Sequence, residues 1–353
     1  MEDFRQSLID WYSVHKRDLP WREDGSPYAV WLSEIILQQT RVAQGSPYYV
    51  KFIERYPSIK NLAQAPLDDI IKMWQGLGYY SRARNLHACA QQICEEYDGE
   101  FPSTKSELLK LKGVGDYTAS AIASIAFGQS VVTIDGNVFR VLSRVFGINE
   151  PIDVPASRKV FAAIGQEAMG PSDPGTFNQA LMEFGALQCV PRSPRCGECP
   201  LQSSCVAFRT DRVDQLPIKK GKTKVEDRWH RYWIVHDKRS TWIRQRPQSG
   251  IWGGMFEFLV EETNILPPWV KEPITEAPAF IPPGDLQVLG TSKHVLSHRK
   301  IHATFIEVRV PSLPEPSANS IRKVLWKDIE QYAWPRLLDR FLQSHENYFS
   351  TDR

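Results

Sequence analysis

The pattern of hydrophobic and polar positions divides the chain into a helical part and a part with strands. Through most of residues 1–210, apolar residues recur at the spacing of an amphipathic helix, as they do at Phe4, Leu8 and Trp11. After residue 228, short stretches alternate between apolar and polar positions, which is typical of strands. These stretches are Arg231 to Val235, Thr241 to Gln245, Met255 to Val260 and Ile301 to Val310.

The boundary between the two parts lies in a polar segment at residues 211–228, with four lysines from Lys219 to Lys224. Polar, charge-rich segments of this kind favour a linker over a folded element. A chain of 353 residues also exceeds the usual size of one domain. The sequence therefore predicts a multidomain protein, with an all-α domain at residues 1–210 and an α+β domain at residues 229–349.

A glycine-rich turn, Leu111-Lys112-Gly113-Val114-Gly115, lies near the middle of the helical part. An apolar helix is predicted to follow it. Two glycines two residues apart permit positive φ and leave amides uncovered at the N-terminus of that helix, which is a site for a phosphate. Residues 106–128 are therefore predicted to form a helix-hairpin-helix that grips nucleic acid, although a Gly-x-Gly pair by itself is more often an ordinary turn.

Two carboxylates in the helical part are candidate catalytic groups. Asp135 stands just before an apolar-periodic stretch, so the N-terminus of the next helix should help to keep it ionised. Glu34 lies in a helix that is apolar almost all round, and partial desolvation should raise its pKa towards that of a general acid. The competing interpretations are a helix cap for Asp135 and a surface glutamate for Glu34.

Four of the six cysteines are clustered with the spacing C-x6-C-x2-C-x5-C, at Cys189, Cys196, Cys199 and Cys205. In a reducing compartment such a cluster indicates metal ligation rather than disulfides. Zinc sites usually have two well separated C-x2-C pairs, whereas this spacing is closer to iron–sulfur ligation by four thiolates. We predict a 4Fe–4S cluster in a loop at residues 189–205, with zinc as the alternative.

Other features concern partners and location. Gly76 to Arg84 combines a glycine loop with two tyrosines and two arginines, a mixture that suits a nucleic-acid surface or a helix start with exposed arginines. The net charge is only +2, so any basic footprint must be local. The N-terminus has no apolar signal region, and no apolar run approaches the ~20 residues that span a bilayer. We therefore expect a cytoplasmic protein with no membrane partner.

Together these motifs resemble the helix-hairpin-helix DNA glycosylases of the endonuclease III type, and most closely the adenine DNA glycosylases of the MutY type. The hairpin, the aspartate about 20 residues after it and the cysteine cluster carry the resemblance to the superfamily. The C-terminal part resembles a Nudix domain. The other matching motifs are Pro20-Trp21-Arg22, Ser33-Glu34, Leu37 to Thr40, Gly76 to Arg84, Asp135 to Val138, Asn178 to Cys189, Ile251 to Glu257 and His294 to Lys300.

The resemblance implies excision of adenine paired with 8-oxoguanine, or with guanine, in double-stranded DNA. It implies a monomeric bacterial enzyme that is associated with the nucleoid through DNA. Glu34 would protonate the adenine and Asp135 would stabilise or capture the oxocarbenium sugar, with Asn137 and Tyr117 as supporting polar groups. The implied DNA contacts are Arg22, Gln39, Tyr79, the hairpin residues Gly113, Val114 and Gly115, which in the family also hold a monovalent cation, and Ser297 and His298, which check for 8-oxoguanine.

Three departures from related patterns refine these expectations. Lyases of the endonuclease III type carry a lysine at the position of Tyr117, so an amine nucleophile for strand cleavage is missing here and a monofunctional glycosylase is predicted. The recognition loop has Leu296 in place of the family's phenylalanine, which removes aromatic stacking. The C-terminal domain lacks the acidic Nudix box, so it should read lesions rather than hydrolyse nucleotides. The alternatives are an endonuclease III-like glycosylase/lyase for oxidised pyrimidines, a catalytically silent DNA-binding module and a Nudix hydrolase.

Overall fold

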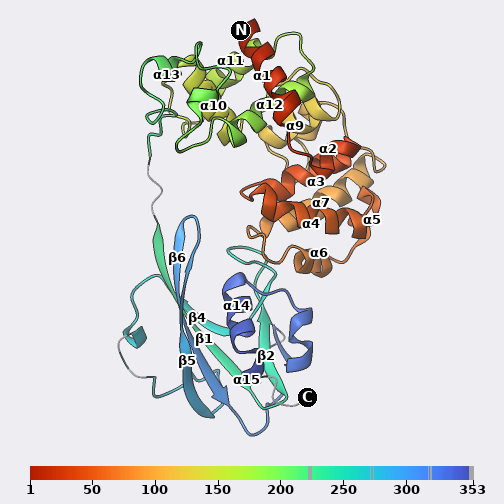
Figure 1. Ribbon diagram of the computed structural model, residues 1–353. Helices are drawn as coiled ribbons and strands as arrows, with labels where there is room; N and C mark the ends of the chain where they lie inside the picture. The colour runs from red at the N-terminus through yellow and green to blue at the C-terminus, as the bar shows by residue number, and fades with distance from the viewer. Residues whose placement is uncertain (222–224, 271, 273, 317, 319, 350–353) are drawn as a thin grey trace. The chain divides into compact units, whose positions relative to one another are not determined.

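The computed structural model describes residues 1–221, 225–270, 272, 274–316, 318 and 320–349 of the chain (Figure 1). The chain divides into two compact units, Met1–Ala65 with Asn85–Lys222 and Pro66–Arg84 with Thr223–Arg353. The second unit therefore includes a short segment from within the helical part of the sequence. None of the described helices is long and apolar enough to cross a membrane.

The described residues of the first unit form helices joined by turns, which confirms the predicted all-α fold. Local sequence explains several helix starts. Ser26 accepts a hydrogen bond from the backbone N of Ala29, and Asp173 caps another helix through Thr176. The helices are α1 (Glu2–His15), α2 (Pro20–Asp24), α3 (Pro27–Leu37), α4 (Val42–Arg55), α5 (Ile59–Gln64), α7 (Ser81–Glu96), which begins in the second unit, α8 (Lys105–Leu108), α9 (Asp116–Ile125), α10 (Gly136–Phe146), α11 (Ser157–Met169), α12 (Pro174–Leu187), η1 (Cys196–Glu198) and α13 (Val206–Arg209).

A large core cluster of the first unit lies among α1, α10, α11 and α12. Trp11 of α1 and Phe184 of α12 contact edge to face, with ring centroids 4.9 Å apart. Phe139 of α10 and Phe161 of α11 make the same kind of contact at 4.8 Å. Burial of these large apolar side chains stabilises the packing. It also fixes the direction of α10, the helix that begins just after Asp135.

The second unit contains strands and a few helices, as predicted for an α+β domain. Its elements are α6 (Leu67–Met73), β1 (Glu226–His236), β2 (Ser240–Gln245), β3 (Phe256–Glu257), β4 (Leu259–Thr263), η2 (Pro268–Val270), β5 (Asp285–Val295), β6 (Arg299–Arg309), β7 (Ile321–Leu325), η3 (Trp326–Gln331), α14 (Arg336–Ser344) and α15 (Glu346–Phe349). A seven-stranded sheet has the order β3-β2-β1-β6-β5, with β4 paired to β1 and β7 to β2. β1 and β6 run parallel. Phe341 of α14 stacks on Phe305 of β6 with ring centroids 4.0 Å apart.

The structure differs from the sequence-based prediction in several strands and in the linker. The single strand predicted at Met255 to Val260 is instead divided into β3 and β4. The apolar pattern does not predict β5 or β7, because most residues of β5 are exposed at the edge of the sheet. Much of the predicted linker packs on the first unit: the carbonyl of Leu216 accepts a hydrogen bond from Arg144 at 3.0 Å, and that of Ile218 accepts one from Ile152 at 2.9 Å. β1 already begins at Glu226. Residues 222–224, with two of the predicted linker lysines, lie outside the described residues.

Candidate active site

Glu34, Tyr117 and Asp135 come together in the first unit although they lie far apart in the sequence. The hydroxyl of Tyr117 lies close enough to the Glu34 carboxylate to hydrogen-bond to it, and it interacts electrostatically with both carboxyl groups. Its other acceptor in the structure is Sδ of Met182, at 3.3 Å. Glu34 belongs to α3 and Tyr117 to α9, two helices that pack against each other. Gln38 at the end of α3 also donates to Thr118 of α9 at 3.2 Å. Helix packing thus places two carboxyl groups and a phenol in one site.

Glu34 has the electrostatics of an acid that can hold a proton near neutral pH. Burial raises its pKa to about 7, and the negative charge of Asp135 acts in the same direction. The hydrogen bond from Tyr117 and the positive charge of Arg22 oppose the increase. A carboxyl group with this pKa is partly protonated at neutral pH, as a general acid must be. The raised pKa expected from the sequence agrees with this environment.

Asp135 is both the N-cap of α10 and a member of the site. Its Oδ1 accepts a hydrogen bond from the backbone N of Val138 at 2.7 Å, and its Oδ2 accepts one from Nδ2 of Asn137 at 2.8 Å. The sequence-based expectation of a low pKa is nevertheless wrong. Burial raises the pKa of Asp135, and it outweighs these hydrogen bonds and the charge of Arg140. Both carboxyl groups therefore have raised pKa values, with more hydrogen bonds opposing the increase at Asp135.

Arg140 holds Asn137 in place, and the sequence analysis does not single it out. Its Nη2 donates to Oδ1 of Asn137 at 2.8 Å and to the carbonyl of Gly185 at 2.5 Å, and its Nε donates to the carbonyl of Cys189 at 2.7 Å. Gly185 permits this close approach, because a Cβ there would lie 2.6 Å from that of Asn137. The contacts join the side chain of Asp135, through Asn137, to the backbone of the first clustered cysteine. In the sequence, the only indication of this role is that Arg140 lies within an apolar stretch.

Asn178 of α12 fixes the extended segment that leads to Asp135. Its fully buried side chain accepts a hydrogen bond from the N of Thr133 at 2.9 Å and donates to Oγ of Ser124 at 2.9 Å and to the carbonyl of Val131 at 2.8 Å. A buried amide that makes three hydrogen bonds orders the backbone around it. Asn178 lies in a motif that the sequence analysis matched, but its positioning role is visible only in the structure.

The glycine hairpin agrees only in part with its predicted geometry. Gly113 has φ +75°, and a Cβ there would lie 2.6 Å from the side chain of Asn85. Both the backbone conformation and the lack of space therefore require glycine. Gly115 has φ −94°, so it does not use the positive φ that a glycine permits. The backbone amides of Lys112 and Val114 are already hydrogen-bonded within the protein. The predicted phosphate site therefore depends on the amides of the two glycines beside the start of α9.

Arg22, predicted to contact DNA, uses its guanidinium within the protein. Its Nη2 forms an ion pair with the buried Glu183 at 2.9 Å, and its Nη1 donates to the carbonyl of Arg17 at 2.9 Å. Burial opposes ionisation of Glu183, but hydrogen bonds from Arg17 and Arg22 lower its pKa to about 2. No local pattern in the sequence indicates this ion pair, because Glu183 lies far away in α12. A DNA contact by Arg22 stays a prediction.

The other predicted DNA-contacting side chains lie on exposed loops. Gln39 and Tyr79 both have positive φ, at 56° and 49°, a conformation that costs about 1–3 kcal/mol outside glycine and clusters at functional sites. In the second unit, the hydroxyls of Tyr79 and Ser297 are hydrogen-bonded to each other. Ser297 and His298 are exposed in the turn between β5 and β6. Tyr79 is therefore adjacent to the predicted recognition loop.

The four clustered cysteines line a common cavity, with the guanidinium of Arg144 3.5 Å from the Sγ of Cys189. Burial raises the pKa of the Cys199 thiol to about 11. No three His, Cys, Asp or Glu side chains in the described ranges are arranged to hold a single metal ion. Four thiols that line one cavity match the ligand set of a cluster in which each thiolate binds a different iron. The donor set therefore fits an iron–sulfur cluster.

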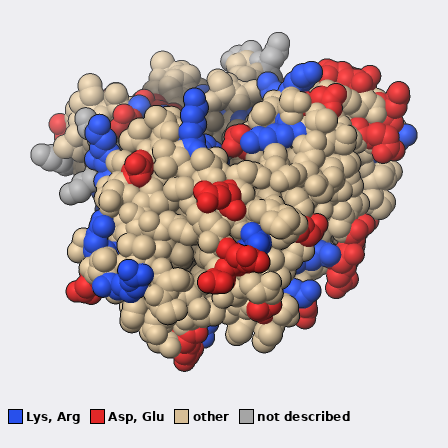
Figure 2. All heavy atoms as spheres, turned by 90° about the horizontal axis from the view of Figure 1, so that it is seen from above, with Lys and Arg blue, Asp and Glu red and all other residues tan. Residues whose placement is uncertain are grey.

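The face of the protein that Figure 2 shows carries charges of both signs. On the face that Figure 2 shows, lysine and arginine side chains are interspersed with aspartate and glutamate, and the described residues form no continuous basic surface there. Binding to a polyanion through this face would therefore gain little from long-range attraction.

Three family models match the chain in consecutive regions. The HhH-GPD superfamily base excision DNA repair protein model matches residues 32–164, and the iron–sulfur binding domain of endonuclease III matches residues 189–205. The NUDIX domain model matches residues 231–344. The first match contains Glu34, Tyr117 and Asp135, and the second contains all four clustered cysteines.

Similar proteins cover most of the chain. It is 34% identical over 331 residues to the adenine DNA glycosylase of Buchnera aphidicola subsp. Baizongia pistaciae (strain Bp), a match that covers 92% of this chain and 91% of that protein. It is 45% identical over 223 residues to the adenine DNA glycosylase of Homo sapiens, covering 60% of this chain and 41% of that protein. A thermostable thymine-DNA glycosylase structure aligns with TM-score 0.55 and 28% identity, over 59% of this chain and 96% of that chain.

Proposed function

The chain belongs to the adenine DNA glycosylases, within the helix-hairpin-helix superfamily of base excision repair proteins, and we propose that it excises adenine paired with 8-oxoguanine, or with guanine, in double-stranded DNA. The observation that carries the proposal is the shared site of Glu34, Tyr117 and Asp135. We further propose that the enzyme acts as a monomer in the bacterial cytoplasm, where DNA binding associates it with the nucleoid.

The chemistry of this bond explains why two carboxyl groups are needed. Adenine departs poorly as an anion, so its ring must receive a proton while positive charge develops on the sugar. Glu34, with a pKa of about 7, can supply the proton at neutral pH. Asp135 would stabilise or capture the cationic sugar once it is ionised. Asn137 would orient that carboxylate through its hydrogen bond to Oδ2.

The side chain of Tyr117 supports a monofunctional reaction. Strand cleavage by β-elimination needs an amine that forms a Schiff base with the sugar. Tyr117 supplies no amine, and burial raises its pKa well above the usual value, so the phenol stays protonated and can donate a hydrogen bond to Glu34. We therefore propose that hydrolysis leaves an intact strand with an abasic site.

The test uses a duplex with one adenine opposite 8-oxoguanine and a label on the adenine strand. Products are compared with and without alkali, beside A·T and thymine-glycol duplexes. We expect breaks only after alkali and only in the A·8-oxoguanine duplex. Breaks without alkali would contradict the monofunctional reaction, and cutting of the thymine-glycol duplex would favour the endonuclease III-like alternative.

The loop at residues 189–205 is the iron–sulfur binding loop, and Cys189, Cys196, Cys199 and Cys205 are its four thiols. A bound cluster would cross-link these residues and thereby order the loop beside α10 and α12.

Replacement of Cys199 by serine is expected to lower the iron and sulfide content of the purified protein by more than half, because one of four thiolate ligands is lost. Iron and sulfide analysis of the wild-type and Cys199→Ser proteins checks this. Cys94→Ser, which changes a cysteine outside the loop at residues 189–205, is the control. Stoichiometric zinc without sulfide in the wild-type protein would contradict the iron–sulfur assignment.

A further inference from the structure

A group of hydrogen bonds joins the end of α6 to the segment around α14 within the second unit. Nε2 of Gln75 donates to Oδ1 of Asp339 at 2.8 Å, while its Oε1 accepts from Nζ of Lys72 at 3.2 Å and from the backbone N of Trp334 at 3.4 Å. Nζ of Lys72 also donates to the carbonyl of Tyr332 at 3.0 Å. We call the side chains of Lys72, Gln75 and Asp339 the latch.

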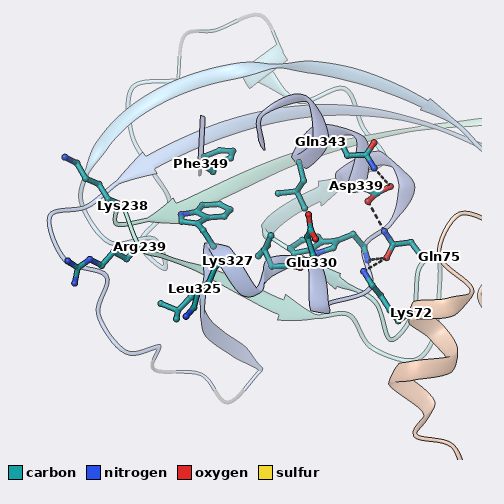
Figure 3. A pocket seen from close by; sticks show the side chains of 14 residues that line it. Lys72, Gln75, Lys238, Arg239, Leu325, Lys327, Glu330, Asp339, Gln343 and Phe349 are labelled. Carbon is teal, nitrogen blue, oxygen red and sulfur yellow. Dashed lines mark hydrogen bonds between the residues drawn. The ribbon is translucent and has the colours of Figure 1, made fainter. Parts of the chain in front are cut away.

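The latch lies at one end of a cavity of about 880 Å³ (Figure 3). Its three side chains are only partly buried, and Gln343 donates to the second oxygen of Asp339 at 3.4 Å. Asp339 therefore has one partner on its own helix and one just after the end of α6. Of these two contacts of Asp339, the one with Gln75 joins the segment after α6 to the C-terminal part of the chain, and the one with Gln343 stays within α14.

The loop that follows Gln75 holds Tyr79 in a strained backbone conformation. Gly78 and Tyr79 have φ +74° and +49°. The carbonyl of Gly78 accepts hydrogen bonds from Nε1 of Trp74 and from Nη2 of Arg82, both at 3.1 Å, and the guanidinium of Arg82 lies over the Trp74 and Tyr79 rings. Strained residues persist only where their surroundings over-determine them. Because Trp74 precedes Gln75 directly, a movement of the latch would reach the loop.

Two further hydrogen bonds join residues 79–84 to the C-terminal domain. The hydroxyl of Tyr79 hydrogen-bonds to Ser297, and Nη1 of Arg84 donates to the carbonyl of Gly253 at 2.5 Å. Residues 66–84 accordingly form one compact unit with the C-terminal domain, although the glycosylase family model spans them. Tyr79, still 49% exposed, is thus held beside the recognition loop.

We infer that the latch positions Tyr79 against Ser297 and His298, so that the side chain predicted to enter the duplex and the loop predicted to check the opposite base act as one recognition surface. The inference rests on the proposed function. None of the latch side chains belongs to the group around Glu34 and Asp135, so they are positioning residues. Their loss should weaken recognition of the A·8-oxoguanine pair and leave the rate of bond cleavage at saturation unchanged.

The experiment compares wild-type full-length protein with Asp339→Ala, Gln75→Ala and the double variant. Asp339→Asn keeps an acceptor for Gln75, and Gln343→Ala removes only the contact within α14. Hydrogen exchange by mass spectrometry reports the order of residues 74–82 in the free protein. Single-turnover rates against enzyme concentration, on A·8-oxoguanine and A·G duplexes, give the half-saturating concentration and the maximal rate separately.

We expect faster exchange in residues 74–82 in Asp339→Ala and Gln75→Ala, and unchanged exchange in Asp339→Asn and Gln343→Ala. The half-saturating concentration for A·8-oxoguanine should rise about tenfold, as expected for loss of a hydrogen bond to a charged group. The half-saturating concentration for the A·G duplex should change less. The double variant should have the same half-saturating concentrations as each single alanine variant, because both changes remove the same hydrogen bond.

Two outcomes would overturn the inference: unchanged exchange in both alanine variants, or faster exchange with equal losses on the two duplexes. If wild-type protein does not cleave the A·8-oxoguanine duplex, the proposed function and the selectivity role fail together, while the exchange data still decide whether the latch orders the loop.

Discussion

Replacing Glu34 with glutamine is expected to lower the single-turnover rate of adenine excision by about 10²- to 10⁴-fold, the usual contribution of a general acid. Glutamine keeps the size of the side chain but cannot give up a proton. Because burial raises the pKa of Glu34 to about 7, the wild-type rate should also fall about tenfold per pH unit above pH 7. The variant should lose this limb of the pH profile.

Stability measurements separate this loss from misfolding. The fold disfavours the charged form of Glu34, since its folded-state pKa lies above that of an exposed glutamate. That cost to the free energy of folding is absent at low pH and grows as the pH rises from about 4.5 to 7. At pH 8 the Glu34→Gln variant should therefore have a melting temperature equal to that of the wild type or higher. The exposed Glu54 provides the control Glu54→Gln, with an unchanged rate. Full activity of Glu34→Gln would mean that a group other than Glu34 is the acid.

Replacing Asp135 with asparagine is expected to lower the excision rate by about 10²- to 10³-fold, because it removes the negative charge that faces the developing cation. Asparagine is a good N-cap, so α10 should keep its start and the hydrogen bond from Val138. Single-turnover kinetics at saturating enzyme check the rate, and gel-shift titration should show DNA binding within about threefold of wild type, since the change is small in size.

Asp173 offers a matched control, because it also caps a helix through its carboxylate, with the backbone N of Thr176 at 2.7 Å. Asp173→Asn makes the same substitution at a cap away from the site and should leave the rate unchanged. Equal losses in the two variants would mean that the effect comes from helix capping. A normal rate in Asp135→Asn would remove this carboxylate from the mechanism.

The sequence by itself determined the fold class, the cysteine loop and the two candidate carboxyl groups. These features are local: helical periodicity and strand alternation report which face of each element is buried, and the cysteine spacing reports a ligand set within 17 residues. The apolar surroundings of Glu34 could also be read directly, because they lie on its own helix. The apolar pattern does not predict β5, because most of its residues are exposed and leave no alternation of buried and exposed positions.

Only the tertiary structure decided how these groups are held and charged. The pKa of Asp135 follows from enclosure by several helices, which outweighs the helix start that its sequence position suggests. Arg140, Asn178 and Glu183 have partners in distant segments. Residues 66–84 join the C-terminal domain through contacts with residues far along the chain, as in the 264-residue separation of Gln75 and Asp339. Desolvation and long-range hydrogen bonds depend on which segments meet in space, and no periodicity along the chain encodes that.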